Sequence, residues 1–268
     1  MADQVLLSAG LDNFDACIEL ACERGLGIEV MAFAFPHVLD SDWEDTLAAY
    51  QHLLQPVPGL ITIHGPFMDM VSGSPDEQIN RICTARYQHA IRIASRLGAE
   101  IVVLHANFIG TLHEAAYRVG WHERNIAFWK PMAEYAEERG VTIALENMFE
   151  FDPDIIGNLL RDVDHPNLRA CLDVGHSHLF SDDGIILDDW IETLQPWIVH
   201  THMNNNDGKL DEHHGFDWEG GVLDYGEVLP KLRALPNPPS MVLEMYHVDD
   251  MRDSLHYFKI GESNKTLA

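Results

Sequence analysis

Short apolar runs alternate with longer amphipathic stretches from one end of the chain to the other. Eight of these runs are rich in Val, Ile and Leu and have the length of buried β-strands. They occupy residues 5–7, 27–31, 60–64, 101–105, 141–146, 168–173, 197–202 and 241–245. Because strands that are separated by helices pair in parallel through right-handed crossovers, this order predicts one parallel sheet.

Three of the intervening stretches carry the signals of helix ends. A helix is predicted over residues 13–24, where apolar residues recur at helical spacing and a glycine follows as a candidate C-cap. A second helix is predicted over 74–97, with Ser74 as N-cap and Pro75 at the first helical position. A third is predicted over 121–139, and a glycine follows each of the last two.

Eight strand and helix units in 268 residues favour a closed barrel over an open doubly wound sheet. No G-x-G-x-x-G sequence follows the first strand, which argues against a dinucleotide-binding fold. The chain also contains no low-complexity tract and no linker between domains. We therefore predict an α/β protein with a single (β/α)8 TIM-barrel domain over residues 1–268.

Acidic residues dominate the charge of the chain. Seventeen Lys and Arg stand against 43 Asp and Glu, which gives a formal net charge of -26 at pH 7. Such a charge repels nucleic acid and anionic membranes, so it argues against a nucleic-acid partner. For most of these carboxylates a solubilising or salt-tolerant surface is the simpler explanation.

Three features bear on where the protein works. The N-terminus lacks a basic segment followed by an apolar run, and no apolar stretch approaches the roughly 20 residues that span a bilayer. Four scattered cysteines form no C-x-x-C pair, which is typical of reduced thiols. We therefore expect a cytoplasmic protein without a membrane partner, and the sequence does not indicate its oligomeric state.

Six consecutive predicted strands end in residue types that bind metals. These residues are His64, His105, Glu146, Asp173, His202 and Glu244. In a (β/α)8 barrel the carboxyl ends of the strands meet at one mouth, where active sites lie. Carboxylates that are crowded there repel one another unless a cation neutralises them, so the pattern predicts a divalent metal. His200 lies one layer deeper on the same strand face as His202 and is interpreted as a packed core residue.

Several short segments of the chain resemble known motifs. They are Ile63-His64-Gly65-Pro66-Phe67, Leu104-His105, Leu145-Glu146-Asn147, Leu172-Asp173-Val174-Gly175-His176, His202-Met203-Asn204, Asp211-Glu212-His213 and Leu243-Glu244. The D-x-x-H after the sixth strand and the D-x-H after the seventh are the most specific of them. On these segments nearly the whole chain resembles the xylose-isomerase-like barrel superfamily, which includes sugar phosphate isomerases and epimerases and the endonuclease IV type of AP endonuclease.

The resemblance to endonuclease IV implies nine metal ligands and between one and three ions. A central metal would be held by four residues that the one-metal epimerases also keep, namely Glu146, Asp173, His202 and Glu244. A second metal would be held by His64 and His105, with Glu146 as a bridge. A third would be held by His176, Asp211 and His213. Imidazole and carboxylate ligands suit Zn²⁺ first and Mn²⁺ second.

The resemblance implies two kinds of reaction. A sugar isomerase or epimerase would move a proton next to a metal-polarised carbonyl, with Glu146 and Glu244 as the catalytic pair. A multi-metal phosphodiesterase would instead cleave DNA at abasic sites. Endonuclease IV contacts DNA through the loops that correspond to 32–40 and 65–70, and these contain no Lys or Arg here, which favours the first reaction. Dehydration of a keto-polyol and a non-catalytic ligand-binding barrel stay open as alternatives.

The expected partner is a small-molecule sugar or polyol. Lys209 and Arg124 are weak candidates for a phosphate site, so a substrate without phosphate is favoured. Three aromatic residues could either line the sugar site or pack in the core, namely Phe67, Trp121 and Trp218.

Overall fold

The eight predicted strands are present and form a closed barrel. The computed structural model describes residues 2–260, in which the strands pair in parallel in chain order and β8 closes against β1. The strands are β1 (Val5–Ala9), β2 (Gly27–Val30), β3 (Ile61–His64), β4 (Ile101–His105), β5 (Thr142–Glu146), β6 (Leu168–Asp173), β7 (Ile198–Met203) and β8 (Ser240–Leu243). The predicted (β/α)8 fold is confirmed, whereas residues 1 and 261–268 of the predicted domain lie outside the described part.

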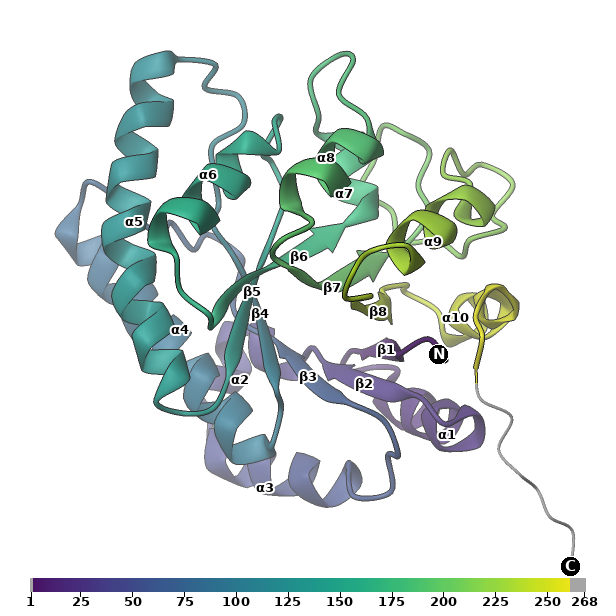
Figure 1. Cartoon of the computed structure of the whole chain (residues 1–268). Coiled ribbons are helices and arrows are strands. Elements are labelled where there is room, and N and C mark those ends of the chain that lie inside the picture. The colour runs from purple at the N-terminus through teal and green to yellow at the C-terminus, as the bar shows by residue number, and fades with distance from the viewer. Residues whose placement is uncertain (1, 261–268) are drawn as a thin grey trace, which may run out of the picture.

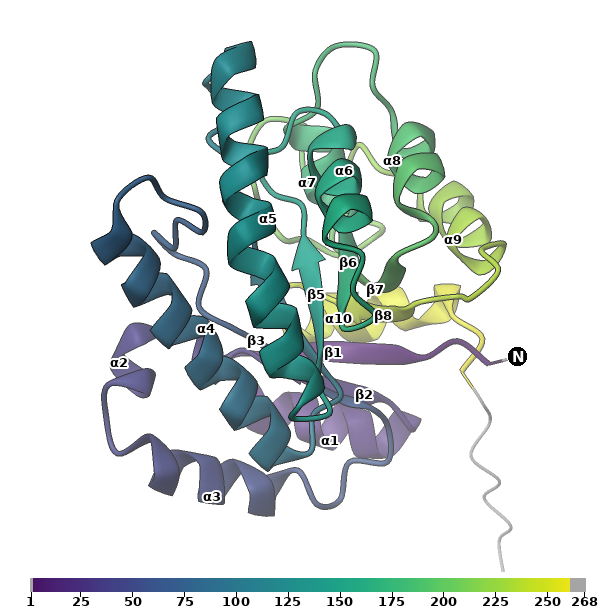
Figure 2. The same ribbon diagram turned by 60° about the vertical axis from the view of Figure 1, so that its left-hand side comes forward.

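Helices surround the strands on the outside of the barrel (Figure 1). They are α1 (Phe14–Arg24), α2 (Pro36–Leu39), α3 (Trp43–Leu53), α4 (Glu77–Leu97), α5 (Ala115–Glu137), α6 (Asp154–Val163), α7 (Val174–Leu179), α8 (Leu187–Leu194), α9 (Tyr225–Arg233) and α10 (Val248–Ser254), with short 3-10 helices η1 (Ala32–Ala34) and η2 (Leu255–Tyr257). Figure 2 shows the long helices α4 and α5 side by side along the outside of the barrel. Within residues 2–260, no helix combines the length and the apolar character that crossing a bilayer requires.

The helix predicted from Ser74 begins later than expected. Helix α4 starts at Glu77, and its N-cap is Asp76, whose carboxylate accepts a hydrogen bond from the backbone N–H of Gln78 at 2.7 Å. The hydroxyl of Ser74 accepts from the N–H of Asp76 at 3.1 Å, so Ser74 shapes the turn before the helix. Asp and Ser are similarly good N-caps, so capping preference alone does not distinguish Ser74 from Asp76 as the N-cap of this helix.

The helix predicted from Trp121 has a longer first part. Helix α5 begins at Ala115, and its N-cap residue makes no side-chain cap bond. The first turn is held by Tyr117, whose ring packs on Phe108 with 5.0 Å between centroids. The Tyr117 hydroxyl also accepts a hydrogen bond from the backbone N–H of Ile109 at 3.0 Å. These contacts are with the preceding loop, so they could not be predicted from the local sequence pattern.

Side chains fill the interior of the barrel below its mouth. A small buried cluster on neighbouring strands consists of Ile101, Val103, Ala144 and Cys171. Each member lies two or four positions before a strand-end residue of β4, β5 or β6, and therefore points to the same face of its strand. This apolar layer supports the strand-end side chains from below, as in other packed barrels.

One ion pair ties the two ends of the described chain to the barrel. Asp3 accepts hydrogen bonds from the Arg233 guanidinium at 3.1 and 2.7 Å and from the backbone N–H of Lys259 at 2.7 Å. Burial alone would raise the pKa of Asp3, but these bonds hold that pKa below its ordinary value of 3.8. A carboxylate with a lowered pKa stabilises the folded state above its ordinary pKa and loses this effect as the pH falls.

We expect Asp3→Asn to lower the free energy of unfolding by about 1 kcal/mol at pH 7, because the bidentate Arg233 pair is partly shielded from solvent. Thermal melts of the variant and the wild type should therefore differ by about 2–4 °C at pH 7. The difference should shrink as the pH falls below 3.8, where the wild-type carboxylate also becomes protonated. Equal melting temperatures at pH 7 would contradict this role for Asp3.

Candidate functional site

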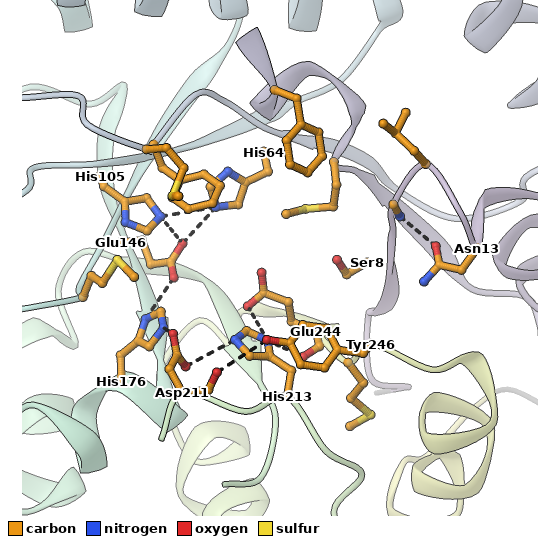
Figure 3. A pocket seen from close by; sticks show the side chains of 18 of the residues that line it. Ser8, Asn13, His64, His105, Glu146, His176, Asp211, His213, Glu244 and Tyr246 are labelled. Carbon is orange, nitrogen blue, oxygen red and sulfur yellow. Dashed lines mark hydrogen bonds and ion pairs between the residues drawn. The ribbon is translucent and has the colours of Figure 1, made fainter. Parts of the chain in front are cut away.

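The carboxyl ends of the strands surround a cavity of about 580 Å³ at the mouth of the barrel. Seven of the nine predicted ligands line it, namely His64, His105, Glu146, His176, Asp211, His213 and Glu244. The other two, Asp173 and His202, have no exposed surface. Figure 3 shows the labelled side chains of this set pointing toward one another from different strands and loops. The structure therefore brings together all nine predicted metal ligands.

Glu146 is the carboxylate on which most of the imidazoles converge. Its Oε2 atom lies 3.0 Å from His105 Nε2, 3.4 Å from His64 Nε2 and 3.2 Å from His202 Nδ1. Its Oε1 atom lies 3.2 Å from His176 Nδ1. The Nε2 atoms of His64 and His105 are 3.3 Å apart. Potential ligand atoms of His64, His105 and Glu146 thus all lie within 4.8 Å of one another.

A second group of potential ligands lies beside the first. Asp211 bridges two imidazoles, with Oδ2 3.4 Å from His176 Nε2 and Oδ1 3.3 Å from His213 Nε2. The carboxylate of Glu244 connects this group to the first, because its Oε2 atom lies 3.7 Å from His213 Nδ1 and 3.2 Å from His202 Nδ1. The arrangement is a continuous cluster, not a set of separate ion pairs.

Three of the histidines present the same nitrogen to the cavity. The Nδ1 atoms of His64, His176 and His213 lie 2.8, 2.9 and 2.8 Å from the backbone carbonyl oxygens of Gly65, Asn147 and Glu244. A ring whose Nδ1–H donates to a carbonyl keeps a lone pair on Nε2, which is the arrangement found in metal-binding histidines. These rings are therefore oriented by the backbone for ligation through Nε2.

Several buried polar atoms of this site have no hydrogen-bond partner, which shows whether a cation fits there. Each member of the predicted central set has a buried atom without a hydrogen-bond partner, namely Glu146 Oε2, Asp173 Oδ2, His202 Nδ1 and Glu244 Oε2. Buried polar atoms without partners are costly and rare, and four in one cluster need a common explanation. A divalent cation among them would satisfy all four, so the residues present fit a metal.

Burial and the neighbouring charges shift the pKa values of these groups. Burial raises the pKa of Asp173 to about 7, and the nearby carboxylates of Glu146 and Glu244 add to this effect. Burial would also raise the pKa of Glu146, but the facing imidazoles hold it well below its usual range. Burial would lower the pKa of His213, whereas Glu244 and Asp211 raise it to about 9. Positive charge is therefore favoured at the mouth, as a metal site requires.

Sequence reasoning missed one buried residue next to this cluster. Glu29 in β2 has no exposed surface, and its Oε1 atom lies 2.8 Å from His202 Nε2. Its Oε2 atom lies 2.8 Å from His200 Nε2, so the interpretation of His200 as a buried, hydrogen-bonded core residue is confirmed. The available signal was an acidic residue inside an otherwise apolar strand.

The three aromatic candidates for the sugar site have different positions. Phe67 lines the cavity and stacks on His105 with 5.3 Å between ring centroids. Trp121 is buried against Phe108 in the core, away from the cavity. Trp218 stacks on His214 with 3.9 Å between centroids and does not line the cavity either.

The wall of the cavity away from the ligands is largely apolar and carries no positive charge. It includes four methionines, namely Met31, Met68, Met148 and Met245. Among the described residues, no Lys or Arg lines the cavity. Arg124 lies elsewhere and donates to the carbonyl oxygen of Gly73 at 2.7 Å, and Lys209 is exposed to solvent. Neither of the two candidates for a phosphate site therefore reaches the mouth.

Two curated proteins have sequences similar to this chain. An uncharacterized protein from Methanocaldococcus jannaschii is 28% identical over 208 residues, which cover 74% of this chain and 69% of that protein. The D-psicose 3-epimerase of Ruminiclostridium cellulolyticum is 23% identical over 174 residues, which cover 62% of this chain and 57% of the epimerase.

Solved structures share the fold over nearly the whole length. A protein from Thermus thermophilus, in a structure obtained by soaking with ZnCl2, has a TM-score of 0.79 at 23% identity, covering 95% of this chain and 96% of that one. A D-tagatose 3-epimerase-like protein has a TM-score of 0.77 at 24% identity, covering 94% of each chain. The sequence profile of a family described as xylose isomerase-like TIM barrel matches residues 11–260. The chain belongs to this family of xylose isomerase-like TIM barrels.

Proposed function

We propose that the protein is a metal-dependent sugar isomerase or epimerase that moves a proton next to a carbonyl group. The observation that carries the proposal is the pair of carboxylates Glu146 and Glu244. They come from different sides of the barrel, yet each lies 3.2 Å from the same atom, His202 Nδ1. Similarity to proteins named D-psicose 3-epimerase and D-tagatose 3-epimerase-like supports this class of reaction.

The nine clustered side chains are the proposed metal ligands. Glu146, Asp173, His202 and Glu244 would hold the central cation. His64 and His105 would hold a second one with Glu146 as a shared ligand, and His176, Asp211 and His213 a third. This donor set suits Zn²⁺, with Mn²⁺ as the second choice. When bound, the central cation supplies polarisation of the substrate carbonyl.

The two carboxylates would transfer the proton at the carbon next to that carbonyl. One of them removes the proton as a general base, and the other donates a proton to the opposite face, which inverts the carbon. Return of the proton to the neighbouring carbon would give isomerisation instead. The apolar wall with Phe67 and the methionines excludes water from the reacting carbon, which limits the loss of the proton to solvent.

A multi-metal phosphodiesterase of the endonuclease IV type is the second candidate. Its support is the nine-residue cluster, which has enough ligands for three ions. The charge of the protein argues against it, because the net charge is -26 and, in the described part, no Lys or Arg lines the cavity to bind a phosphate backbone.

Assays of the zinc-loaded protein with a panel of ketoses and keto-polyols, and with an abasic-site oligonucleotide, distinguish the two. We expect conversion of at least one sugar, seen as formation of its epimer or isomer. We expect no cleavage of the oligonucleotide. Cleavage at low enzyme concentration, lost when Glu146 is replaced by Gln, would reverse the order of the two candidates.

A phosphate ester of a sugar should be a poorer substrate than the free sugar. For a ketose that the protein converts, we expect kcat/KM to be about tenfold or more higher than for its phosphate ester, which corresponds to about 1.4 kcal/mol. The reason is that the net charge of -26 repels the phosphate group, and no Lys or Arg in the described part of the cavity wall can bind it. Because salt screens this repulsion, the ratio should narrow at high ionic strength. A phosphate ester that reacts as well as the free ketose would contradict this reading of the cavity.

A further inference from the structure

Glu29 is a charged residue in the interior of the barrel, directly below the mouth. It has no exposed surface, and its carboxylate lies between two histidines of β7, with 2.8 Å to His202 Nε2 and 2.8 Å to His200 Nε2. Burial of a carboxylate costs several kcal/mol unless it is paired, so an apolar residue would fill this space at a lower cost in stability. A purely structural role therefore does not explain its presence.

The two nitrogens of the His202 ring face different groups. Nε2 faces Glu29, whereas Nδ1 lies 3.2 Å from both Glu146 and Glu244. The Nε2 atom of His202 and the Oε1 atom of Glu29 are both buried, lie 2.8 Å apart and have no hydrogen-bond partner elsewhere. Since a carboxylate accepts hydrogen bonds, it keeps the proton on Nε2 and leaves Nδ1 as the ligand atom.

His202 differs in this respect from three other histidines of the cluster. The rings of His64, His176 and His213 donate from Nδ1 to backbone carbonyls and present Nε2 to the cavity. His202 is reversed, and its partner is a charged side chain, which increases the basicity of the ring more than a carbonyl does. We propose that Glu29 positions His202 so that this histidine binds the central metal through Nδ1. The inference rests on the metal site of the proposed function.

Three further residues hold Glu29 itself. The hydroxyl of Thr62 donates to Glu29 Oε2 at 2.8 Å, and His200 Nε2 lies 2.8 Å from the same oxygen. The Nδ1 atom of His200 lies 2.5 Å from the hydroxyl of Ser240, which completes the chain of contacts. These residues belong to β3, β7 and β8, while Glu29 belongs to β2, so four strands fix the carboxylate. With its Oε2 atom occupied by two donors, Glu29 keeps Oε1 for His202.

Zinc affinity of the Glu29→Gln variant tests the inference. The amide has one oxygen where the carboxylate has two, so it cannot accept from His202 on one side and from Thr62 and His200 on the other. Competition with a chelating dye should show zinc binding at the central site weakened by about 10–100-fold. The matched control is Glu150→Gln, because Glu150 is equally buried but accepts from the backbone N–H groups of Phe108 and Met148. The control should change the zinc affinity less than about twofold, because its hydrogen bonds are to backbone N–H groups and not to a proposed metal ligand.

Long-range ¹H–¹⁵N NMR spectra of the zinc-loaded proteins give a readout that a structural role would not move. In the wild type, the His202 ring should be zinc-bound at Nδ1 and protonated at Nε2. In Glu29→Gln these His202 signals should shift, while those of His213 stay in place. Zinc bound to Nε2 of His202, or equal zinc affinity in Glu29→Gln and the wild type, would overturn the inference alone. A wild type that binds no zinc would overturn the proposed metal site as well.

Discussion

Replacing Glu146 by Gln should lower kcat for the best sugar substrate by about 10²–10⁴-fold, the usual contribution of a positioned acid or base. The carboxylate of Glu146 lies within 3.4 Å of nitrogen atoms of four histidines, so no other residue of the cluster has as many ionisable neighbours at this distance. The amide keeps the size of the side chain but removes both the proton acceptor and the negative charge. Metal content should fall together with turnover, because the same oxygens are proposed ligands.

The Glu150→Gln variant is the control for this experiment too. Glu150 is the other buried glutamate near the end of β5, and its oxygens bind backbone N–H groups instead of imidazoles. We expect this control to retain kcat within a small factor of the wild type. Turnover by Glu146→Gln at more than about one tenth of the wild-type rate would be incompatible with a role in proton transfer.

Removal of the metal should lower the melting temperature by about 8–16 °C. A ligand that binds only the folded state stabilises it by about 4 kcal/mol when it is present at a thousand times its dissociation constant. For a chain of this size each kcal/mol corresponds to about 2–4 °C. Thermal melts with excess ZnCl2 and with excess EDTA measure the difference directly. The metal should stabilise the folded state because it would bind the buried carboxylate oxygens of Asp173 and Glu244, which have no hydrogen-bond partner.

Two variants separate this effect from unspecific binding of zinc to a highly acidic surface. Asp173→Asn and Glu244→Gln each remove one charge of the central set and leave the remaining acidic surface intact. Their melting temperatures should respond to ZnCl2 much less than that of the wild type. A variant that is as strongly stabilised as the wild type would show that zinc acts elsewhere.

The fold could be predicted because local pattern and topology agree. Each strand is an apolar run, since both faces of a parallel barrel strand are buried, and several helices end before glycines with positive φ, such as Gly25 and Gly98. The positions of the six strand-end residues followed from the same reasoning, because barrel closure brings successive strand ends to one mouth, whereas His176, Asp211 and His213 were implied by the family resemblance. Residues as far apart as His64 and Glu244 could be grouped without any knowledge of their contacts.

What could not be predicted depends on contacts between distant residues. Glu29 faces His200, which is 171 positions away in the sequence, and nothing near Glu29 reveals this partner. The first turn of α5 is held by the ring of Tyr117 against the preceding loop, so the predicted start at Trp121 was wrong. Whether Trp218 and Phe67 pack in the core or line the cavity could not be predicted either, because the local sequence pattern is the same in both cases.

Anomalous diffraction from crystals of the zinc-loaded protein, recorded at the zinc absorption edge, tests the central claim most directly. The account predicts a peak at the mouth of the barrel, within about 2.0–2.2 Å of ligand atoms from Glu146, Asp173, His202 and Glu244. The atom of His202 that lies closest to this peak should be Nδ1. A map without any peak among these four residues, from crystals grown and soaked with zinc in excess, would contradict the account.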